Sequence, residues 1–154
     1  PRANQVRLSS EVYNGSSIAS LGIAAHEVGH AIQHATNYAP LTVRNMVVPA
    51  TNISSYIYFP LILLGMFLNS MSMIQLGILV FAVIVFFQLI TLPVEFNASR
   101  RAIATLGSDQ VLDTNELTGA KKVLGAAALT YVAALVAAVS QLLQFMWIFG
   151  NGND

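Results

Sequence analysis

The stretch NMVVPATNISSYIYFPLILLGMFLNSMSMIQLGILVFAVIVFFQLITLPV, residues 45–94, contains no Asp, Glu, Lys or Arg. About 20 apolar residues cross a bilayer as a helix, so this stretch is long enough to cross twice. The polar cluster Asn69–Ser72 divides it into a helix near Ile53–Leu68 and a second near Met73–Leu92, which we expect to end at Pro93. We therefore predict a transmembrane helical hairpin. A hairpin buried in a soluble core is the alternative.

A second uncharged stretch begins at Val123, and its strongly apolar part ends near Phe149. Asp113 or Thr114 can cap a helix that starts before this stretch, and Glu116 favours the first turn of that helix. The stretch is long enough for a third membrane span.

The composition agrees with a membrane protein. Of the 154 residues, 55% are hydrophobic and 9% are charged, against about 25% charged in soluble domains. Seven Lys and Arg balance seven Asp and Glu, so no basic field predicts a nucleic-acid partner. Cysteine is absent, so any metal must be held by histidines and carboxylates.

The basic residues predict how the spans are oriented. Arg44 precedes the hairpin, and Arg100, Arg101, Lys121 and Lys122 lie between the second and third spans. Cytoplasmic loops carry an excess of Lys and Arg. We expect a multi-pass protein of the cell (inner) membrane, with this basic side in the cytoplasm. Because the chain begins at a proline without an initiator methionine, we also expect it to be part of a longer protein.

The first 44 residues are less apolar than the spans. Val6–Leu8 alternates as a short strand does, and it could be an edge to which an extended substrate adds its backbone. Ser16 or Ser17 can cap a helix that runs to about Ala35. That helix is apolar around most of its circumference, so we expect it to be buried in protein or to lie against the membrane face.

This helix contains HEVGH, residues 26–30, which matches the H-E-x-x-H pattern of zinc peptidases. His26 and His30 are four positions apart, so on a helix both rings share one face and can bind one Zn²⁺. Glu27 lies beside them and can act as the general base that takes a proton from water. A pair of core histidines with an incidental glutamate is the alternative.

A catalytic zinc needs a third protein ligand. His34 is eight residues beyond His26, or about 12 Å along a helix axis, which is too far for one ion to bridge. A role in substrate contact, in supporting the ligands, or simple exposure remains for it. Glu95 follows the second span, so the hairpin returns it to the side from which the first span departed. Glu95 is the predicted third ligand; pairing with Arg100 or Arg101 is the alternative.

The segments LSSEVYNGSSIASLGIAAHEVGHAIQHATNYAPL, LPVEFNASRRA and AKKVLGAAALTYVAAL closely resemble the neutral zinc metallopeptidases of bacterial membranes, the YugP-like family. The resemblance covers most of the chain and implies a preceding segment with a further membrane helix. The order of H-E-x-x-H, membrane hairpin and E-F-x-A is also similar to the gluzincin membrane peptidases related to HtpX and the CaaX prenyl proteases. This similarity implies that Glu95 binds the zinc.

Those gluzincins usually carry an Asp four residues after the ligand Glu, where it orients a zinc-binding His. Here the position is Ser99, and Asn97 is another candidate for that role. The resemblance also implies a donor for the developing oxyanion, commonly Tyr, His or Arg. Tyr13, His34, Arg100 and Arg101 are the candidates.

The predicted fold is mainly α, a multi-pass membrane helical protein with a gluzincin-like HExxH helix at the membrane interface and a short N-terminal strand. We divide it into an interfacial zinc-peptidase segment (1–44), a transmembrane hairpin (45–94), a cytoplasmic segment with the third zinc ligand (95–122) and a third transmembrane helix (123–149).

The predicted function is zinc-dependent endoproteolysis of membrane or membrane-proximal proteins, with a protein or peptide substrate and the lipid bilayer as partners. A non-catalytic scaffold with a four-ligand zinc site is one alternative. A site-2-type intramembrane protease is the other. It requires an Asp ligand within a span, whereas Asp113 lies among polar loop residues.

Overall fold

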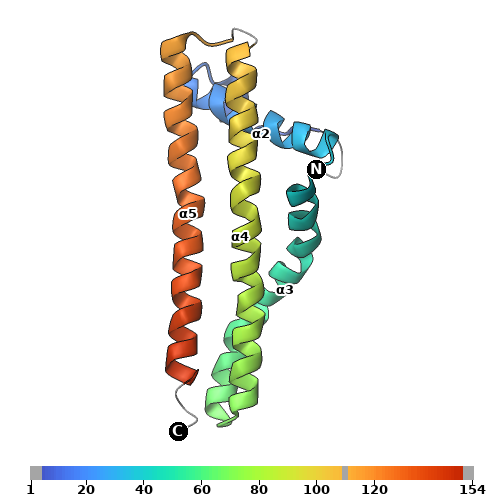
Figure 1. Ribbon diagram of the computed structural model, residues 1–154, viewed down its shortest axis with the longest axis vertical. Helices are drawn as coiled ribbons and strands as arrows, with labels where there is room; N and C mark the ends of the chain where they lie inside the picture. Colours follow the sequence, from blue (N-terminus) through green and yellow to red (C-terminus); the bar gives the residue numbers. More distant parts are fainter. Residues whose placement is uncertain (1–4, 109–110, 151–154) are drawn as a thin grey trace. The chain divides into compact units, whose positions relative to one another are not determined.

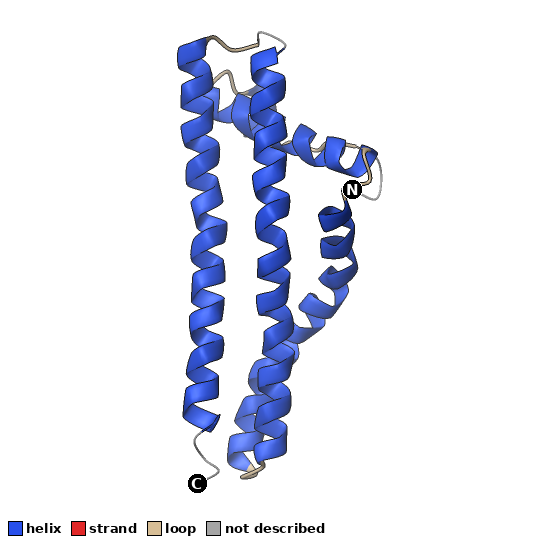
Figure 2. Ribbon diagram, in the orientation of Figure 1, coloured by secondary structure: helices blue, strands red, loops and turns tan. Residues whose placement is uncertain are grey.

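The computed structural model describes residues 5–108 and 111–150, and these are almost entirely helical (Figures 1 and 2). The helices follow the chain in the order α1 (Ser10–Asn14), α2 (Ile18–Ala35), α3 (Ala39–Phe67), α4 (Met71–Ser108) and α5 (Thr114–Gly150). The mainly α prediction is therefore confirmed.

The predicted N-terminal strand is wrong. Residues 5–9, which include Val6–Leu8, have no regular secondary structure, and Figure 2 shows no strand in the described part of the chain. A strand is stabilised by its ladder with a neighbouring strand, and no other described segment is extended to provide one. The suggestion that a substrate adds to this edge loses its basis for the same reason.

The three predicted spans correspond to α3, α4 and α5. All three are long and apolar enough to cross a membrane, with 29, 38 and 37 residues. In the most apolar 18-residue stretch of α3, α4 and α5, only 17%, 22% and 11%, respectively, is buried inside the protein. Side chains such as Tyr56 and Phe67 are 81% and 88% exposed. An apolar solvent around these faces removes the cost of exposing them to water.

The second span does not end at Pro93 as predicted, because α4 continues through this proline to Ser108. A proline inside a helix removes one hydrogen bond and crowds the preceding turn. The helix continues here through residues that pack tightly, since Val94 is fully buried and Glu95 is 3% exposed. Glu95 consequently lies on a helix, and Ser99 shares its face one turn later.

Side chains cap the helices at two predicted positions. Ser17 begins α2, and its hydroxyl accepts a hydrogen bond from the N–H of Ser20 at 3.1 Å. Asp113 begins α5, where one carboxylate oxygen accepts from the N–H groups of Asn115 and Glu116, each at 2.8 Å. The Glu116 carboxylate accepts in turn from the Asp113 N–H at 3.0 Å. This reciprocal arrangement is a capping box.

Two asparagines end helices in the left-handed conformation, Asn37 after α2 (φ 50°) and Asn69 after α3 (φ 51°). Asn tolerates this conformation better than most residues with a side chain. After Asn69, the N–H of Ser70 donates to the carbonyl of Gly65 at 2.8 Å, which completes a Schellman motif. The predicted turn between the first two spans is therefore confirmed.

The chain forms two compact units. The first comprises Pro1–Thr42 and Leu92–Tyr131, and the second comprises Val43–Thr91 and Val132–Asp154. In the second unit, the Phe81 ring contacts Tyr58 and Phe145, with ring centroids 4.9 and 5.4 Å apart. These contacts join segments of α3, α4 and α5.

The first unit holds every residue of the candidate site. Its hydrophobic cluster centres on Leu106, Leu112 and Ala120, and the partly buried side chains packed against it are Ile18, Leu21, Ala25, Ile103 and Leu117. These residues come from α2, from the C-terminal part of α4, from the N-terminal part of α5 and from the loop between α4 and α5. They hold α2 against the segment of α4 that carries Glu95.

Candidate metal centre

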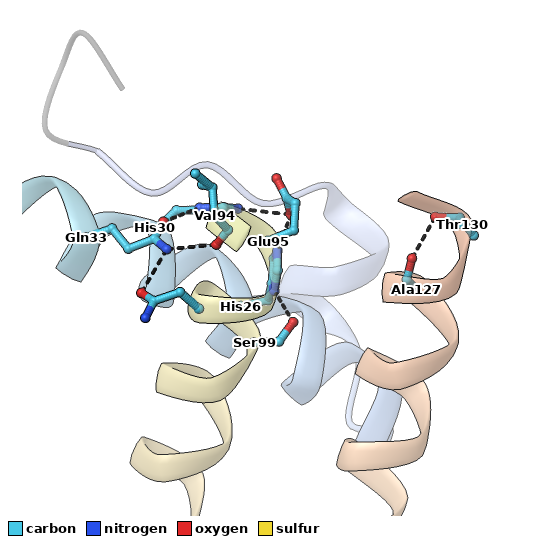
Figure 3. Close-up of polar contacts among 9 residues, drawn as sticks. His26, His30, Gln33, Val94, Glu95, Ser99, Ala127 and Thr130 are labelled. Atoms are coloured by element: carbon cyan, nitrogen blue, oxygen red, sulfur yellow. Dashed lines mark hydrogen bonds and ion pairs between the residues drawn. The ribbon is translucent and has the colours of Figure 1, made fainter. Parts of the chain in front are cut away.

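Helix α2 presents His26 and His30 on one face, with ring centroids 4.7 Å apart. Glu95 of α4 lies against both rings (Figure 3). Its Oε2 is 3.0 Å from the Nε2 of His26 and 3.4 Å from the Nε2 of His30. One ligand atom from each of the three residues lies within 4.8 Å of the others. This is the one three-ligand group of His, Asp and Glu in the described part of the chain.

The donor types, and their separations from Glu95, fit a zinc ion. Zinc lies about 2.0–2.2 Å from His nitrogens and carboxylate oxygens, so tetrahedral ligand atoms are roughly 3.3–3.5 Å apart. The two separations from the Glu95 oxygen, 3.0 and 3.4 Å, are close to that range. Two imidazoles and one carboxylate are also a donor set that zinc accepts in catalytic sites, with one position left for water.

Gly29 sets the distance between α2 and α4. A Cβ atom built at Gly29 would lie 2.4 Å from the carbonyl oxygen of Ala98 and 3.0 Å from its carbonyl carbon. No real Cβ approaches backbone atoms so closely, so only glycine permits this helix contact. Ala98 is fully buried there. The contact lies between the two histidines on one helix and beside Glu95 on the other, so it positions all three.

A buried hydrogen-bond network fixes the orientation of His30. Arg101 can only donate, so the Asn97 atom that it contacts at 2.8 Å is the side-chain oxygen. The same oxygen accepts from the Gln33 amide nitrogen at 3.0 Å, and that nitrogen also donates to the carbonyl of Val94 at 2.8 Å. The Gln33 oxygen is therefore left to face the Nδ1 of His30, at 2.9 Å.

This network decides the tautomer of His30. Because the Gln33 oxygen can only accept, the Nδ1 of His30 carries a proton. In the neutral ring the Nε2 that faces Glu95 then holds a lone pair, whereas in the protonated ring it donates a hydrogen bond to Glu95. Gln33 is fully buried, so the hydrogen bond is shielded from water. An imidazole held in this way is ready to bind a metal through Nε2.

His26 is oriented by Ser99. The hydroxyl of Ser99 lies 3.0 Å from the Nδ1 of His26, while the Nε2 of His26 faces Glu95 (Figure 3). The hydroxyl can accept a hydrogen bond from an Nδ1–H group of His26. The structure thus places Ser99 at the position predicted for a ligand orienter, whereas Asn97 acts on His30 through Gln33.

The carboxylates around the site favour positive charge. Burial lowers the pKa of His30, but its hydrogen bonds to Glu95 and Gln33 and the negative charges of Glu95 and Glu27 outweigh burial, so its pKa is raised above 6.5. The same field attracts a metal cation.

Glu27 lies beside the three candidate metal ligands and does not belong to that group. It is half-buried, and no hydrogen bond or ion pair ties its carboxylate to another described residue. Its negative charge acts on His30. A carboxylate that is near the site and not engaged elsewhere can accept a proton from water.

The residues predicted as oxyanion donors are not part of the candidate metal centre. Tyr13, on α1, is 77% exposed, and His34 is exposed near the end of α2. Neither belongs to the metal-ligand group. Arg100 is exposed on α4, and Arg101 is engaged with Asn97 and lies over the Tyr38 ring at 5.8 Å.

A cavity of about 180 Å³ adjoins the candidate ligands His26 and Glu95. Its walls come from α2, α4 and α5, and are formed by Ile23, His26, Glu95, Ser99, Leu124, Ala127, Ala128 and Tyr131. Four of these eight side chains are apolar, and Tyr131 is an aromatic residue with a hydroxyl. Figure 3 also shows the neighbouring turn of α5, in which the Thr130 hydroxyl donates to the Ala127 carbonyl at 2.6 Å.

Two site residues, Gln33 and Tyr131, were not predicted from the sequence. Gln33 follows His30 by three residues in a mostly apolar helix, and that spacing on a helix is a signal that could have revealed it. Tyr131 lies 36 residues after Glu95 (131 − 95) in a different helix. No local pattern in the sequence connects it with the site.

Comparisons with known proteins point to a family of zinc peptidases. A family model described as "Putative neutral zinc metallopeptidase" matches residues 1–150. The chain is 50% identical over 154 residues to "Putative membrane protease YugP" of Bacillus subtilis (strain 168), covering 100% of this chain and 68% of that relative. No solved structure matches the chain.

Proposed function

This chain belongs to the neutral zinc metallopeptidase family, and we propose that it is a membrane-embedded zinc metalloendopeptidase. We assign the zinc to His26, His30 and Glu95. The observation that carries this assignment is the convergence of two Nε2 atoms on one Glu95 oxygen, at 3.0 and 3.4 Å. The resemblance to a membrane protease and the three apolar helices support a substrate in or near the membrane.

The proposed reaction is hydrolysis of a peptide bond by water. A zinc ion bound to the three ligands supplies Lewis acidity, which lowers the pKa of water and polarises the substrate carbonyl. Glu27 accepts a proton as the water oxygen bonds to the carbonyl carbon. It then passes that proton to the amide nitrogen as the carbon–nitrogen bond breaks. Tyr131, whose side chain lines the adjoining cavity, is the candidate donor to the developing oxyanion.

The side of the membrane is part of the proposal. Arg100, Arg101, Lys121 and Lys122 belong to the same compact unit as the candidate ligands. Basic residues that flank spans are retained in the cytoplasm. We therefore place the site on the cytoplasmic side of the cell membrane.

Zinc binding and peptide cleavage can be separated by replacing Glu27. In the purified full chain, Glu27→Gln should bind one zinc per chain and cleave less than about 1% of what the wild type cleaves, since general bases contribute roughly 10²–10⁴-fold. Glu11→Gln changes an exposed carboxylate on α1 and should keep both properties. Full cleavage by Glu27→Gln would refute the mechanism.

The two alternative functions make different demands on the site. A scaffold with structural zinc needs a fourth protein ligand, and the described part of the chain offers three residues at the centre. A site-2-type protease would use Asp113, whose carboxylate instead caps α5 through Asn115 and Glu116. Glu27, close to the ligands and not engaged elsewhere, favours hydrolysis over either alternative.

A further inference from the structure

A second and larger cavity, of about 570 Å³, lies between α4 and α5 in the first unit. We call it the basic groove. The residues that line it are Tyr38, Pro93, Phe96, Asn97, Ser99, Arg100, Ile103, Lys121, Leu124, Gly125 and Ala128. Three of them, Ser99, Leu124 and Ala128, also line the small cavity that contains His26 and Glu95. The basic groove therefore adjoins the candidate metal centre.

The charge of the basic groove has a single sign. Arg100 and Lys121 are the charged residues among those that line it, and both are exposed. Neither side chain forms a hydrogen bond or ion pair within the described part of the chain. Apolar walls such as Phe96 and Ile103 lower the local dielectric, which strengthens the attraction between these cations and an anionic group.

Asn97 adds a neutral donor to the basic groove. Its side-chain oxygen already accepts from Gln33 and Arg101. Asn97 lines the groove, and the amide NH₂ group of the same side chain can serve as a donor. An anion or a peptide carbonyl would meet three donor groups here, and no carboxylate lines the groove to repel it.

We propose that the basic groove binds the substrate polypeptide on one side of the scissile bond and selects an acidic residue, Asp or Glu, at that position. This inference rests on the proposed peptidase function. A peptide is the favoured occupant because the groove adjoins the cavity beside the proposed zinc ligands, so one extended segment can reach both. An anionic lipid headgroup would use the same cations without needing that proximity.

The test uses the purified, zinc-loaded full chain in neutral detergent micelles. Its substrates are peptides that are identical except for Glu, Gln or Lys at single positions within a few residues of the cleaved bond. At one position, kcat/KM for Glu should exceed that for Lys by about tenfold, given the strength of partly exposed ion pairs. The double variant Arg100→Glu with Lys121→Glu should reverse this preference.

Lys122→Glu is the matched control. Lys122 is the exposed neighbour of Lys121 and does not line the basic groove. Its reversal changes the net charge of the protein in the same direction, yet it should leave the Glu to Lys ratio within about twofold of the wild type. A shift in Lys122→Glu as large as in the double variant would show a general charge effect and would overturn the proposal.

Binding of the same peptides to zinc-loaded Glu27→Gln tests the basic groove separately from peptide cleavage. It shows whether the groove proposal or the proposed peptidase function is wrong. Tighter binding of the Glu peptide, lost in the double variant, supports the groove even if the wild type cleaves nothing. Cleavage of Glu and Lys peptides at equal rates by both proteins overturns the groove and leaves the peptidase function intact. If the double variant instead loses only its binding to phosphatidylglycerol vesicles, the groove is a lipid site and the proposal is wrong.

Discussion

Replacing Gly29 by alanine tests how the metal centre is held together. The added Cβ would lie 2.4 Å from the carbonyl oxygen of Ala98, where normal contact needs about 3.5 Å. Both contacting groups belong to helix backbones, so neither can rotate away. Helices α2 and α4 must separate locally by roughly 1 Å (3.5 − 2.4), and such overpacking costs about 1–3 kcal/mol.

The separation acts directly on the ligands. If α2 moves by about 1 Å, the distances of 3.0 and 3.4 Å between the Glu95 oxygen and the two histidines grow to roughly 4.0 and 4.4 Å. Zinc ligand atoms are separated by about 3.3–3.5 Å. Zinc affinity should fall at least about tenfold, which corresponds to 1.4 kcal/mol, and peptide cleavage should fall with it.

Chelator competition on the purified full chain measures this affinity, and Gly22→Ala provides the control on the same helix. A Cβ at Gly22 would meet its nearest neighbours, Leu124 and Ala120, at 3.9 and 4.0 Å, which are ordinary contacts. Gly22→Ala should keep its zinc and gain up to about 1 kcal/mol from helix propensity. If Gly29→Ala binds zinc as tightly as Gly22→Ala, close helix contact does not position the ligands.

Two further variants test the supporting residues. Gln33→Leu removes the acceptor that holds the Nδ1 of His30 and should weaken zinc binding about 10–100-fold in the same competition assay; unchanged affinity would contradict that role. Asp113→Ala removes the cap of α5 and should lower the free energy of unfolding by about 1 kcal/mol without releasing zinc. Zinc loss in Asp113→Ala would favour the site-2-type arrangement.

The spans could be predicted because the sequence offers a strong and local signal. The stretch 45–94 lacks charge throughout, and the polar cluster Asn69–Ser72 marks the turn that divides it. The residues at which the helices end were harder to predict from the sequence. Pro93 would end a helix in water, but packing of its neighbours carries α4 through it. The strand at Val6–Leu8 was wrong because three alternating residues are too short a pattern, and a strand requires a partner that no local sequence specifies.

The site residues also fall into those that the local sequence predicts and those that only the packing of helices reveals. His26, Glu27 and His30 belong to one local motif, and the path of the hairpin led to Glu95 without any knowledge of packing. Gly29 packs against Ala98 of α4, which is remote in the sequence. The residues around Gly29 therefore do not predict this close contact. Tyr131 is brought to the cavity by a third helix. Only the packing of α5 against α2 and α4 reveals it.

X-ray diffraction from crystals of the zinc-loaded full chain, recorded on both sides of the zinc absorption edge, tests the central claim most directly. We expect one anomalous peak per chain, about 2.0–2.2 Å from the Nε2 atoms of His26 and His30 and from a Glu95 carboxylate oxygen. The fourth position should be open to water. A peak without Glu95 among its ligands, or one closed by a fourth protein side chain, would contradict the proposed peptidase centre.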